Sequence, residues 1–417
     1  MDNPVNFSHA TFSINTRAWY CIVLLMAFCA AGTAEANTLV TPRVSVRAEY
    51  DDNVRFTRTD PVGDGILGLR PSVELQYRTE RLESNTSAAV RALRYLEESD
   101  LNREEILLDS SLSYGLLERL SLQGDVSYHK DSALESELEE TGLVTHQEDR
   151  VFMSAGGGFI FHLTELQELG GSFSLSQTEY DGDRFTDYDT SHAALSWTRR
   201  FRNQRDALIL QPYWSSNTSD ASEVKTLGFM VGWNRMLTEK WSLKAFAGLR
   251  RTQTEYQRAQ QEVVFDPNLL PAFPFRLELE TSTQEETSWG GVADVSFRWT
   301  GETWRFDVSY NRDLSYTSQG EPIERDRLGL SVRKRLTKRL IAQCSATGYL
   351  SQYDGQFSEA ETRHVIFSPS ISYRLTETHQ LSAGFRYDVN EDASREDTRR
   401  DRKRIWVSVD FAFPQIW

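Results

Sequence analysis

The residues in this sequence best able to do chemistry are charged side chains that alternate with apolar ones. Arg305 and Asp307, for example, are interleaved with Trp304, Phe306 and Val308. In an extended chain successive side chains point to opposite faces, so the charges share one face and the apolar residues share the other. We expect the polar face to line a hydrated lumen, where charges of both signs select solutes. The residues assigned to this lumen are Lys244, Arg250, Asp294, Arg298, Arg305, Asp307, Arg327, Arg333, Arg374, Arg386, Asp388, Arg404 and Asp410. The alternative is that these groups pair across strands and simply fill the interior.

Catalytic chemistry finds weaker support in the sequence. The candidate general bases are the histidines His129, His146, His162, His192, His364 and His379. None lies in a GxSxG, HExxH or paired-carboxylate motif. Ser191 and His192 are adjacent in a predicted strand, so they point to opposite faces and cannot act together. We therefore predict no enzyme, no cofactor and no metal site, and we keep an outer-membrane hydrolase of lipid or glycan as an alternative.

Acidic residues gather in two segments between the alternating runs. The first holds Glu97, Glu98, Asp100, Glu104 and Glu105, and the second holds Glu135, Glu137, Glu139 and Glu140. Such clusters could hold divalent cations that bridge lipopolysaccharide phosphates. Their spacing matches no calcium-binding loop, so we favour solvated loops that keep the surface soluble. The formal charge of -15 argues against a nucleic-acid partner.

From about residue 42 to the end, apolar residues recur with a period of two, which predicts β-strands. Short polar hinges such as HLTELQEL, MLTEKWSL, RLTKRLIA and RLTETHQL separate many of the runs. Threonine and glutamate oxygens in these hinges can accept hydrogen bonds from turn amides. Short connections on one side and long ones on the other predict an all-β, antiparallel up-and-down barrel of about 18 strands (16 to 18), with both termini on the short-turn side.

Three observations favour a membrane barrel over a soluble sandwich. Alternating Ile405, Val407, Val409 and Phe411 lead to a terminal Trp417, a signature that resembles the end of bacterial outer-membrane barrels. The second face is too polar for a dry core. Tryptophans near the hinges fit an aromatic girdle at the membrane interface. The girdle residues are Trp197, Trp233, Trp241, Trp299, Trp304 and Trp417.

The N-terminus predicts export. Arg17 precedes the apolar run AWYCIVLLMAFCAA, and Ala34 and Ala36 follow in a small-residue pattern. Residues 1–36 are predicted to be a cleavable signal peptide and residues 37–417 a single barrel domain. The run is shorter than a membrane span, which disfavours an anchor. Cleavage leaves Cys344 as the one remaining cysteine, so no internal disulfide can form.

The longest insertion, residues 258–286, contains the apolar stretch VVFDPNLLPAFPFRLE. Connections of this length in compact domains are usually functional. Folded inward, the segment would narrow or plug the lumen. Folded outward, it would cap neighbouring loops.

The stretch VSVRAEYDDNVRF, with EYDDN at residues 49–53, resembles outer-membrane porin-like barrels found with exopolysaccharide and exosortase-type export systems. The resemblance implies an outer-membrane location in a Gram-negative bacterium and a link to polysaccharide, and it implies no catalytic residue. We expect a porin-like channel or export pore for hydrophilic solutes or glycans. The expected partners are outer-membrane lipid and lipopolysaccharide, the insertion machinery and polysaccharide. A closed structural or adhesion barrel is the alternative.

Overall fold

The computed structural model describes residues 37–416 apart from 144–146, 183, 221, 266–274, 318–320, 354–360 and 394–397, and it leaves the side chains of 257–283 undescribed. The predicted signal peptide, His146 and Trp417 lie outside the described residues. Within the part of the chain that the structure describes, no helix is both long and apolar enough to cross a membrane.

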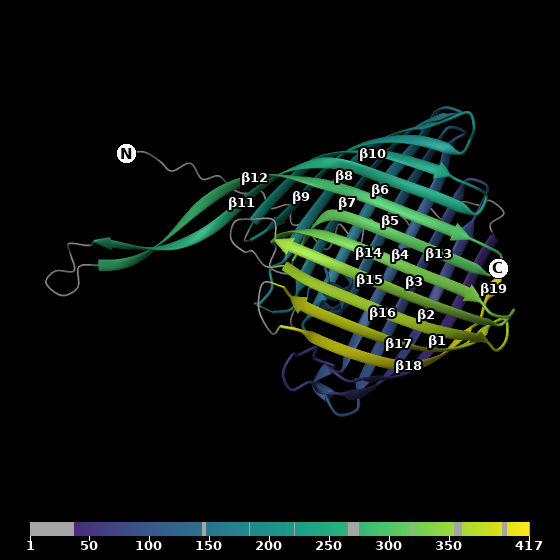
Figure 1. The fold of residues 1–417 in the computed structure, drawn as a ribbon, viewed down its shortest axis with the longest axis horizontal. Helices are drawn as coiled ribbons and strands as arrows, with labels where there is room; N and C mark the ends of the chain where they lie inside the picture. The colour runs from purple at the N-terminus through teal and green to yellow at the C-terminus, as the bar shows by residue number, and fades with distance from the viewer. Residues whose placement is uncertain are drawn as a thin grey trace.

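The chain folds into long antiparallel strands joined in sequence order (Figure 1). The first nine are β1 (Asn37–Asp51), β2 (Asp64–Arg78), β3 (Leu82–Tyr95), β4 (Arg103–Leu117), β5 (Leu120–Ser132), β6 (Asp149–Thr164), β7 (Gln167–Tyr180), β8 (Tyr188–Arg200) and β9 (Asp206–Ser219). The next nine are β10 (Ser222–Met236), β11 (Trp241–Phe265), β12 (Phe275–Thr300), β13 (Trp304–Tyr316), β14 (Pro322–Arg335), β15 (Leu340–Tyr353), β16 (Glu361–Arg374), β17 (His379–Asp392) and β18 (Arg400–Ala412). The short elements are β19 (Gln415–Ile416), the 3-10 turn η1 (Ser99–Leu101) and the helix α2 (Ala133–Glu140).

The sheet closes on itself between its first and last long strands. β1 pairs with β2 on one side and with β18 on the other, in a register that matches Arg43 with Ala412 and Asp51 with Arg404. Closure leaves no free sheet edge, which is how an antiparallel sheet can satisfy its backbone groups in lipid. The 18-stranded antiparallel barrel predicted from the period of two is confirmed.

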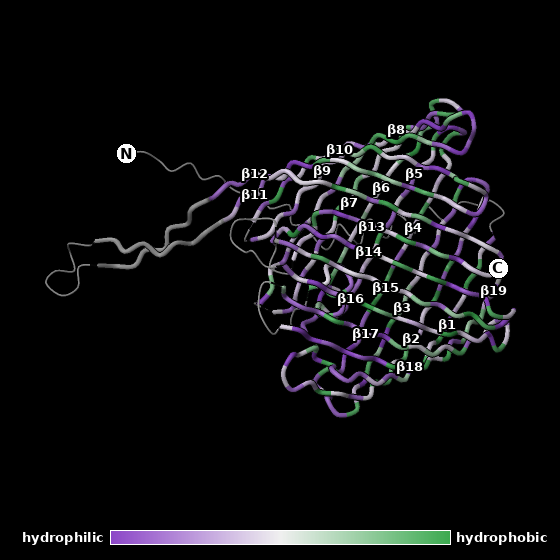
Figure 2. The backbone as a smooth tube through the Cα atoms, in the orientation of Figure 1, coloured by the Kyte–Doolittle hydropathy of each residue, from purple (hydrophilic) through white to green (hydrophobic). Residues whose placement is uncertain are grey.

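The outside of the barrel is apolar. On β10 the side chains of Leu227, Phe229, Val231 and Trp233 are 64%, 47%, 44% and 38% exposed, which no soluble core would allow. Ile405 and Val407 are exposed in the same way on β18. Figure 2 shows hydrophobic residues spread along the barrel wall and hydrophilic residues gathered at the end with the long connections.

The recurring hinges are tight turns whose threonine hydroxyls accept amide hydrogen bonds. Thr238 Oγ1 accepts from the backbone N–H groups of Lys240 and Trp241, both at 3.2 Å. Thr337 Oγ1 accepts from Leu340 at 3.0 Å, and Thr376 Oγ1 accepts from His379 at 3.0 Å. The prediction for threonine is confirmed, because an unpaired turn amide beside lipid would be costly.

Aromatic side chains form a row near the short turns. Cross-strand register places Trp241 beside Trp299, and Trp299 beside Phe306. The ring centroids of these two pairs are 5.7 Å and 5.2 Å apart. Trp304 stacks on Phe306 at 5.5 Å, and Trp233 lies 5.4 Å from Phe201. Trp197 lies three residues before the end of β8, at the same end of the barrel.

The expectation of a long loop at 258–286 was wrong for the described part. β11 and β12 continue as a paired ribbon as far as Phe265 and Phe275. In Figure 1 this ribbon projects away from the barrel instead of entering it. Continuous cross-strand pairing satisfies the backbone of the ribbon, so the ribbon needs no support from the lumen.

Candidate functional site

A helix from the connection between β5 and β6 occupies the lumen. In α2, Leu134 is 2% exposed and Leu138 is fully buried, and both pack against Phe56 from the connection between β1 and β2. The contacts of α2 reach β6, β7, β14, β15, β17 and β18. Strands from opposite parts of the wall can meet one helix only if that helix lies inside the barrel.

Carboxylates of α2 pair with arginines of the wall. Glu135 accepts hydrogen bonds from Arg402 at 2.6 Å and from Arg404 at 3.2 Å. Glu139 lies 2.7 Å from Arg386 on β17. Arg402 is 1% exposed, so its charge depends on these acids rather than on water.

Two further acids complete this cluster. Asp388 is fully buried and lies 2.9 Å from Arg386, 3.2 Å from Arg404 and 3.4 Å from Arg402. Asp51 lies 4.0 Å from Arg402. The three arginines and four acids that join α2 to β17, β18 and β1 are called the lumenal ion cluster below.

The C-terminal end of α2 is also held through backbone carbonyl groups, by donors on β15 and β17. Tyr349 donates to the Glu139 carbonyl at 2.7 Å, and Ser351 donates to the Thr141 carbonyl at 2.7 Å. Asn390 donates to the Gly142 carbonyl at 2.8 Å. These donors satisfy carbonyl groups that a helix C-terminus leaves without internal partners. The sequence therefore fixes α2 in one orientation across the lumen.

Gly142 ends the helix with a φ of 73°, a left-handed conformation that glycine adopts without strain. A Cβ atom there would lie 2.7 Å from Tyr349 and 3.1 Å from His364. The chain can approach the barrel wall this closely because the residue has no side chain.

Two acids of α2 have opposite electrostatics. Burial alone would raise the pKa of Glu135, but the guanidinium groups of Arg402, Arg404, Arg386 and Arg103 hold it well below its usual value. Burial, together with the neighbouring Glu140, raises the pKa of Glu137 to about 7. Glu137 is 2% exposed and accepts hydrogen bonds from Tyr180 at 3.0 Å and Thr141 at 3.1 Å. One acid is fixed as a carboxylate, and the other titrates near neutral pH.

A cavity of about 600 Å³ lies between α2 and the wall formed by β1, β2, β3, β4, β17 and β18. Its charged lining includes Arg47, Arg70, Arg91, Arg386 and Arg404. The indole of Trp406 lies across Gly384, whose Cβ would meet it at 2.6 Å, and the Arg47 guanidinium stacks over its ring at 4.5 Å. The cavity is within the usual range for small-molecule sites.

The EYDDN segment lies at the seam where the barrel closes. Glu49 pairs with Arg47 inside the cavity, and Asp51 belongs to the lumenal ion cluster. Asp52 accepts a hydrogen bond from the Lys403 backbone at 2.6 Å, and Asn53 donates to the Asp401 carbonyl at 3.0 Å. The motif fastens β1 to β18 and supplies acids to the lumen.

The residues assigned to the lumen fall into three groups: those at the cavity, the pair Arg250 and Arg327, and those near the short turns. Arg386, Arg404 and Asp410 line the cavity, and Asp388 joins the ion cluster beside it. Arg250 is 1% exposed and bonds Thr252 at 2.6 Å, while Arg327 lies over the Tyr349 ring at 5.4 Å. The others lie near the short turns and do not join the cavity, namely Lys244, Asp294, Arg298, Arg305, Asp307, Arg333 and Arg374.

Ion pairs account for several of the charged residues near the short turns. Asp307 lies 2.5 Å from Arg298 and 2.8 Å from Arg305, and Lys244 lies 3.9 Å from Asp294. Both interpretations of the lumenal charges therefore have examples: some fill the interior as ion pairs, and others border open space.

The expectation that the acidic segments are solvated loops was wrong for Glu105 and Glu137, whereas Glu97, Asp100 and Glu104 are exposed. Glu105 is 1% exposed and pairs with Arg91 and Arg103, and Glu137 is buried in α2. Among the residues that the structure describes, no group of His, Cys, Asp and Glu is arranged to hold a metal ion. Glu105 pairs with wall arginines, and Glu137 accepts hydrogen bonds from Tyr180 and Thr141.

The described histidines are scattered over the barrel. His129 contacts Asp109 at 3.0 Å, His162 lies 3.6 Å from Glu168, and His379 contacts Thr376 at 2.7 Å. The His192 ring lies 5.9 Å from that of Tyr213. His364 is fully buried beside Phe56 and Tyr349. Asp109 also accepts a hydrogen bond from Ser127 at 2.9 Å, but among the described residues no hydrogen bond joins Ser127 to His129.

Sequence reasoning missed α2 and its arginine partner Arg402, as well as the cavity residues Arg47, Arg70, Arg91 and Trp406. One signal was available. Leu134 and Leu138 are four residues apart, as are Glu135 and Glu139, which is helical spacing inside a sequence of period two. The side of the barrel that this helix occupies depends on tertiary contacts.

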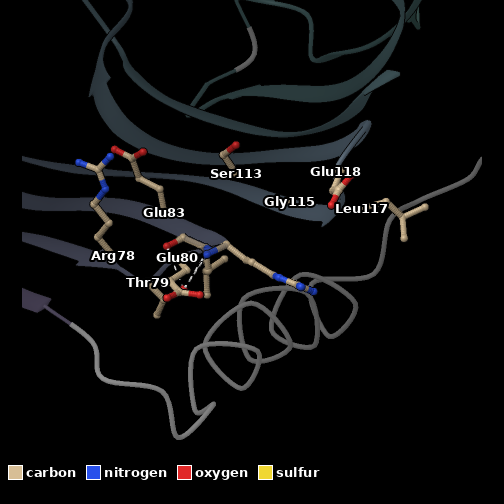
Figure 3. A pocket seen from close by; sticks show the side chains of 10 residues that line it. Arg78, Thr79, Glu80, Glu83, Ser113, Gly115, Leu117 and Glu118 are labelled. Carbon is tan, nitrogen blue, oxygen red and sulfur yellow. Dashed lines mark hydrogen bonds between the residues drawn. The ribbon is translucent and has the colours of Figure 1, made fainter. Parts of the chain in front are cut away.

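A second pocket, of about 360 Å³, lies at the short-turn end between the β2–β3 and β4–β5 turns (Figure 3). It is lined by turn residues, including Thr79, whose hydroxyl accepts from the Leu82 amide at 3.0 Å. The side chains in Figure 3 do not converge on a common point, so this pocket is a surface feature of the turns.

The closed antiparallel barrel, the apolar exterior and the charged interior together define a transmembrane β-barrel of the outer-membrane type. The chain is an outer-membrane β-barrel. No protein-family model matches it, and no curated protein matches it.

Several solved structures are similar in fold. The ferric-catecholate import receptor Fiu from E. coli K12 has a TM-score of 0.48 at 9% identity, over 90% of this chain and 81% of that one. OccK2 (OpdF) from Pseudomonas aeruginosa has a TM-score of 0.46 at 10% identity, over 91% and 98%. The outer membrane protein OpdK from the same species has a TM-score of 0.43 at 10% identity, over 91% and 99%. Likeness at this level identifies no solute.

Proposed function

We propose that this barrel is a porin-like channel for hydrophilic solutes, whose lumen is restricted by α2. The observation that carries the proposal is the charged cavity of about 600 Å³ beside α2. Arg70 borders the cavity without a carboxylate partner among the described residues, and a barrel that served only as a scaffold would gain nothing from it. Charged walls instead provide a path for polar solutes.

The restriction has the features of a movable element. α2 takes part in two small buried clusters, one of Leu134, Leu138 and Phe56 and one of Ala133 with Tyr180 and Phe185. The other contacts named above are ion pairs and hydrogen bonds. Segments with few buried apolar contacts open locally at a lower free-energy cost than the sheet around them.

The link to exopolysaccharide export is a finer proposal that rests on the resemblance of the EYDDN segment. On this proposal the barrel sits in lipopolysaccharide-containing membrane, is inserted by the outer-membrane assembly machinery and passes glycan or glycan-derived solutes.

A closed structural or adhesion barrel is the second candidate. The ribbon of β11 and β12, which projects beyond the wall in Figure 1, favours it, because the outer edge of a two-stranded ribbon can pair with a strand of an external partner.

Planar-bilayer recording tests the two candidates. We expect small, fluctuating conductance from the full chain and larger, steadier conductance when residues 134–141 are replaced by a short Gly/Ser linker. Absence of conductance from both proteins, each shown to be folded by heat-modifiable gel mobility, would overturn the channel proposal and favour the closed barrel.

A further inference from the structure

Two arginines of neighbouring strands, Arg70 and Arg91, border the cavity, and Arg70 has no carboxylate partner among the described residues. Register places Arg70 of β2 level with Arg91 of β3, since Leu69 pairs with Ala92 and Ser72 pairs with Ala89. Both side chains line the cavity. Like charges directly opposite each other destabilise a sheet. An arginine pair at this position therefore needs an anion to offset the repulsion.

One carboxylate of the protein, that of Glu105, offsets only part of this positive charge. Glu105 pairs with Arg91 and also with Arg103 at 2.9 Å, so one carboxylate serves two guanidinium groups. Arg70 is exposed to the cavity and has no hydrogen bond or ion pair with any described residue. Arg91 keeps 42% of its side chain exposed despite its partner.

The cross-strand row that contains Arg70 also contains Asp410, whose carboxylate can accept hydrogen bonds. Ser45 of β1 lies between Arg70 and Asp410 of β18 in the register. Asp410 lines the cavity and forms no ion pair within the described part of the chain. The two unmatched charges are separated by two strand spacings, about 10 Å. A carboxylate accepts hydrogen bonds from solute hydroxyl groups, and Ser45 can donate or accept.

The acids at the upper end of the cavity do not neutralise Arg70. Glu135, Glu139 and Asp51 are bound to Arg386, Arg402 and Arg404 in the lumenal ion cluster, and Asp131 is bound to Arg150 at 3.0 Å. Glu49 is engaged by Arg47. Of the described arginines that line the cavity, Arg70 is therefore left without a carboxylate, and the half-exposed Arg91 lies beside it.

We propose that the cavity is a binding site for a small hydroxylated anion of the sugar-acid type. Its oxyanion would bind Arg70 and Arg91, and its hydroxyl groups would meet Ser45 and Asp410. Guanidinium groups bind carboxylate and phosphate with paired hydrogen bonds, so both oxyanions fit the arginine side. α2 roofs the site through Glu135, Ser136 and Glu139. The inference rests on the proposed channel only for the route by which the solute arrives.

Isothermal titration calorimetry on the detergent-solubilised barrel tests the site without requiring transport. The probes are glucuronate, glucose 1-phosphate and glucose, which separate carboxylate, phosphate and neutral solutes. We expect the preferred anion to bind at least tenfold more tightly than glucose and to weaken as salt is raised. Whichever anion binds more tightly identifies the oxyanion.

Four variants locate the binding. Arg70→Gln should weaken binding of the anion about tenfold or more, Arg70→Lys should restore part of it, and Asp410→Asn should weaken binding of hydroxylated anions. Arg78→Gln is the matched control, because Arg78 lies on the same strand but at the short-turn pocket. Equal affinity for glucose and both anions, or unchanged anion binding by Arg70→Gln, would overturn the site. Binding without conductance would uphold the site and leave only the channel proposal overturned.

Discussion

Glu135 of α2 accepts a hydrogen bond from Arg402 of β18 at 2.6 Å, although 267 residues separate the two in the sequence. This bond ties the connection after β5 to the strand that closes the barrel. Arg402 is 1% exposed and also contacts Asp388 at 3.4 Å, so the pair belongs to a cluster from which water is largely excluded.

Replacing Glu135 with alanine should loosen α2. Removing one partner of a buried ion pair leaves an uncompensated charge, which costs about 3 kcal/mol. We expect larger and noisier single-channel conductance, with the barrel itself still folded. The control is Glu104→Ala, which breaks an exposed pair with Arg94 and should leave conductance unchanged. Equal conductance of Glu135→Ala and the unaltered protein would show that Glu135 does not hold α2 in place.

Docking of α2 should depend on pH through Glu137. Its pKa is raised to about 7 in the folded chain, so the docked state favours the protonated form. The protonated form contributes its full stability below the ordinary glutamate pKa, and that stability is lost as the pH rises through about 7. We expect conductance recorded in bilayers to increase as the pH rises from about 4.5 to about 7 and to change little above that.

Glu137→Gln provides the control, because the amide stays neutral at every pH and keeps the size of the side chain. This variant should remain in the low-conductance state at pH 8. A pH response of the same size in Glu137→Gln would assign the titration to another group.

Gly142→Ala should displace the end of α2 for a steric reason. The added Cβ would lie 2.7 Å from Tyr349, and alanine disfavours the φ of 73°. We expect faster amide hydrogen exchange in residues 133–143 and increased conductance. Gly348→Ala is the matched control, since a Cβ there meets nothing within 4 Å. Unchanged exchange in Gly142→Ala would mean that α2 tolerates the shift.

The sequence determined the barrel wall more completely than its contents. Alternation fixes which side chains share a face, so Arg386, Arg404 and Asp410 could be assigned to the lumen and are found at the cavity. Strand pairing is local, since each strand pairs with its neighbours in the chain except at the seam. The choice of an inward helix depends instead on contacts such as that between Glu139 and Arg386, which are 247 residues apart. No local period encodes those partners.

The same limit explains the ribbon of β11 and β12. Its length and apolar residues left an inward plug and an outward cap both open, and extended pairing carries the backbone away from the wall. Length and composition indicated an unusual segment but gave no direction. The direction follows from whether the backbone finds its partners within the ribbon or in the lumen.

The two faces of one strand should respond differently to an added charge. Leu330 on β14 is 45% exposed on the outer surface, and its neighbour Ser331 points to the opposite face. Leu330→Arg should destabilise the barrel by about 2–4 kcal/mol near the middle of the bilayer, because a guanidinium there loses its hydration. Ser331→Arg enters the hydrated lumen and should cost about 1 kcal/mol or less. Reversible urea unfolding in lipid vesicles, followed by tryptophan fluorescence, measures both. Equal destabilisation by the two variants would contradict the assignment of the outer face to lipid and the inner face to water.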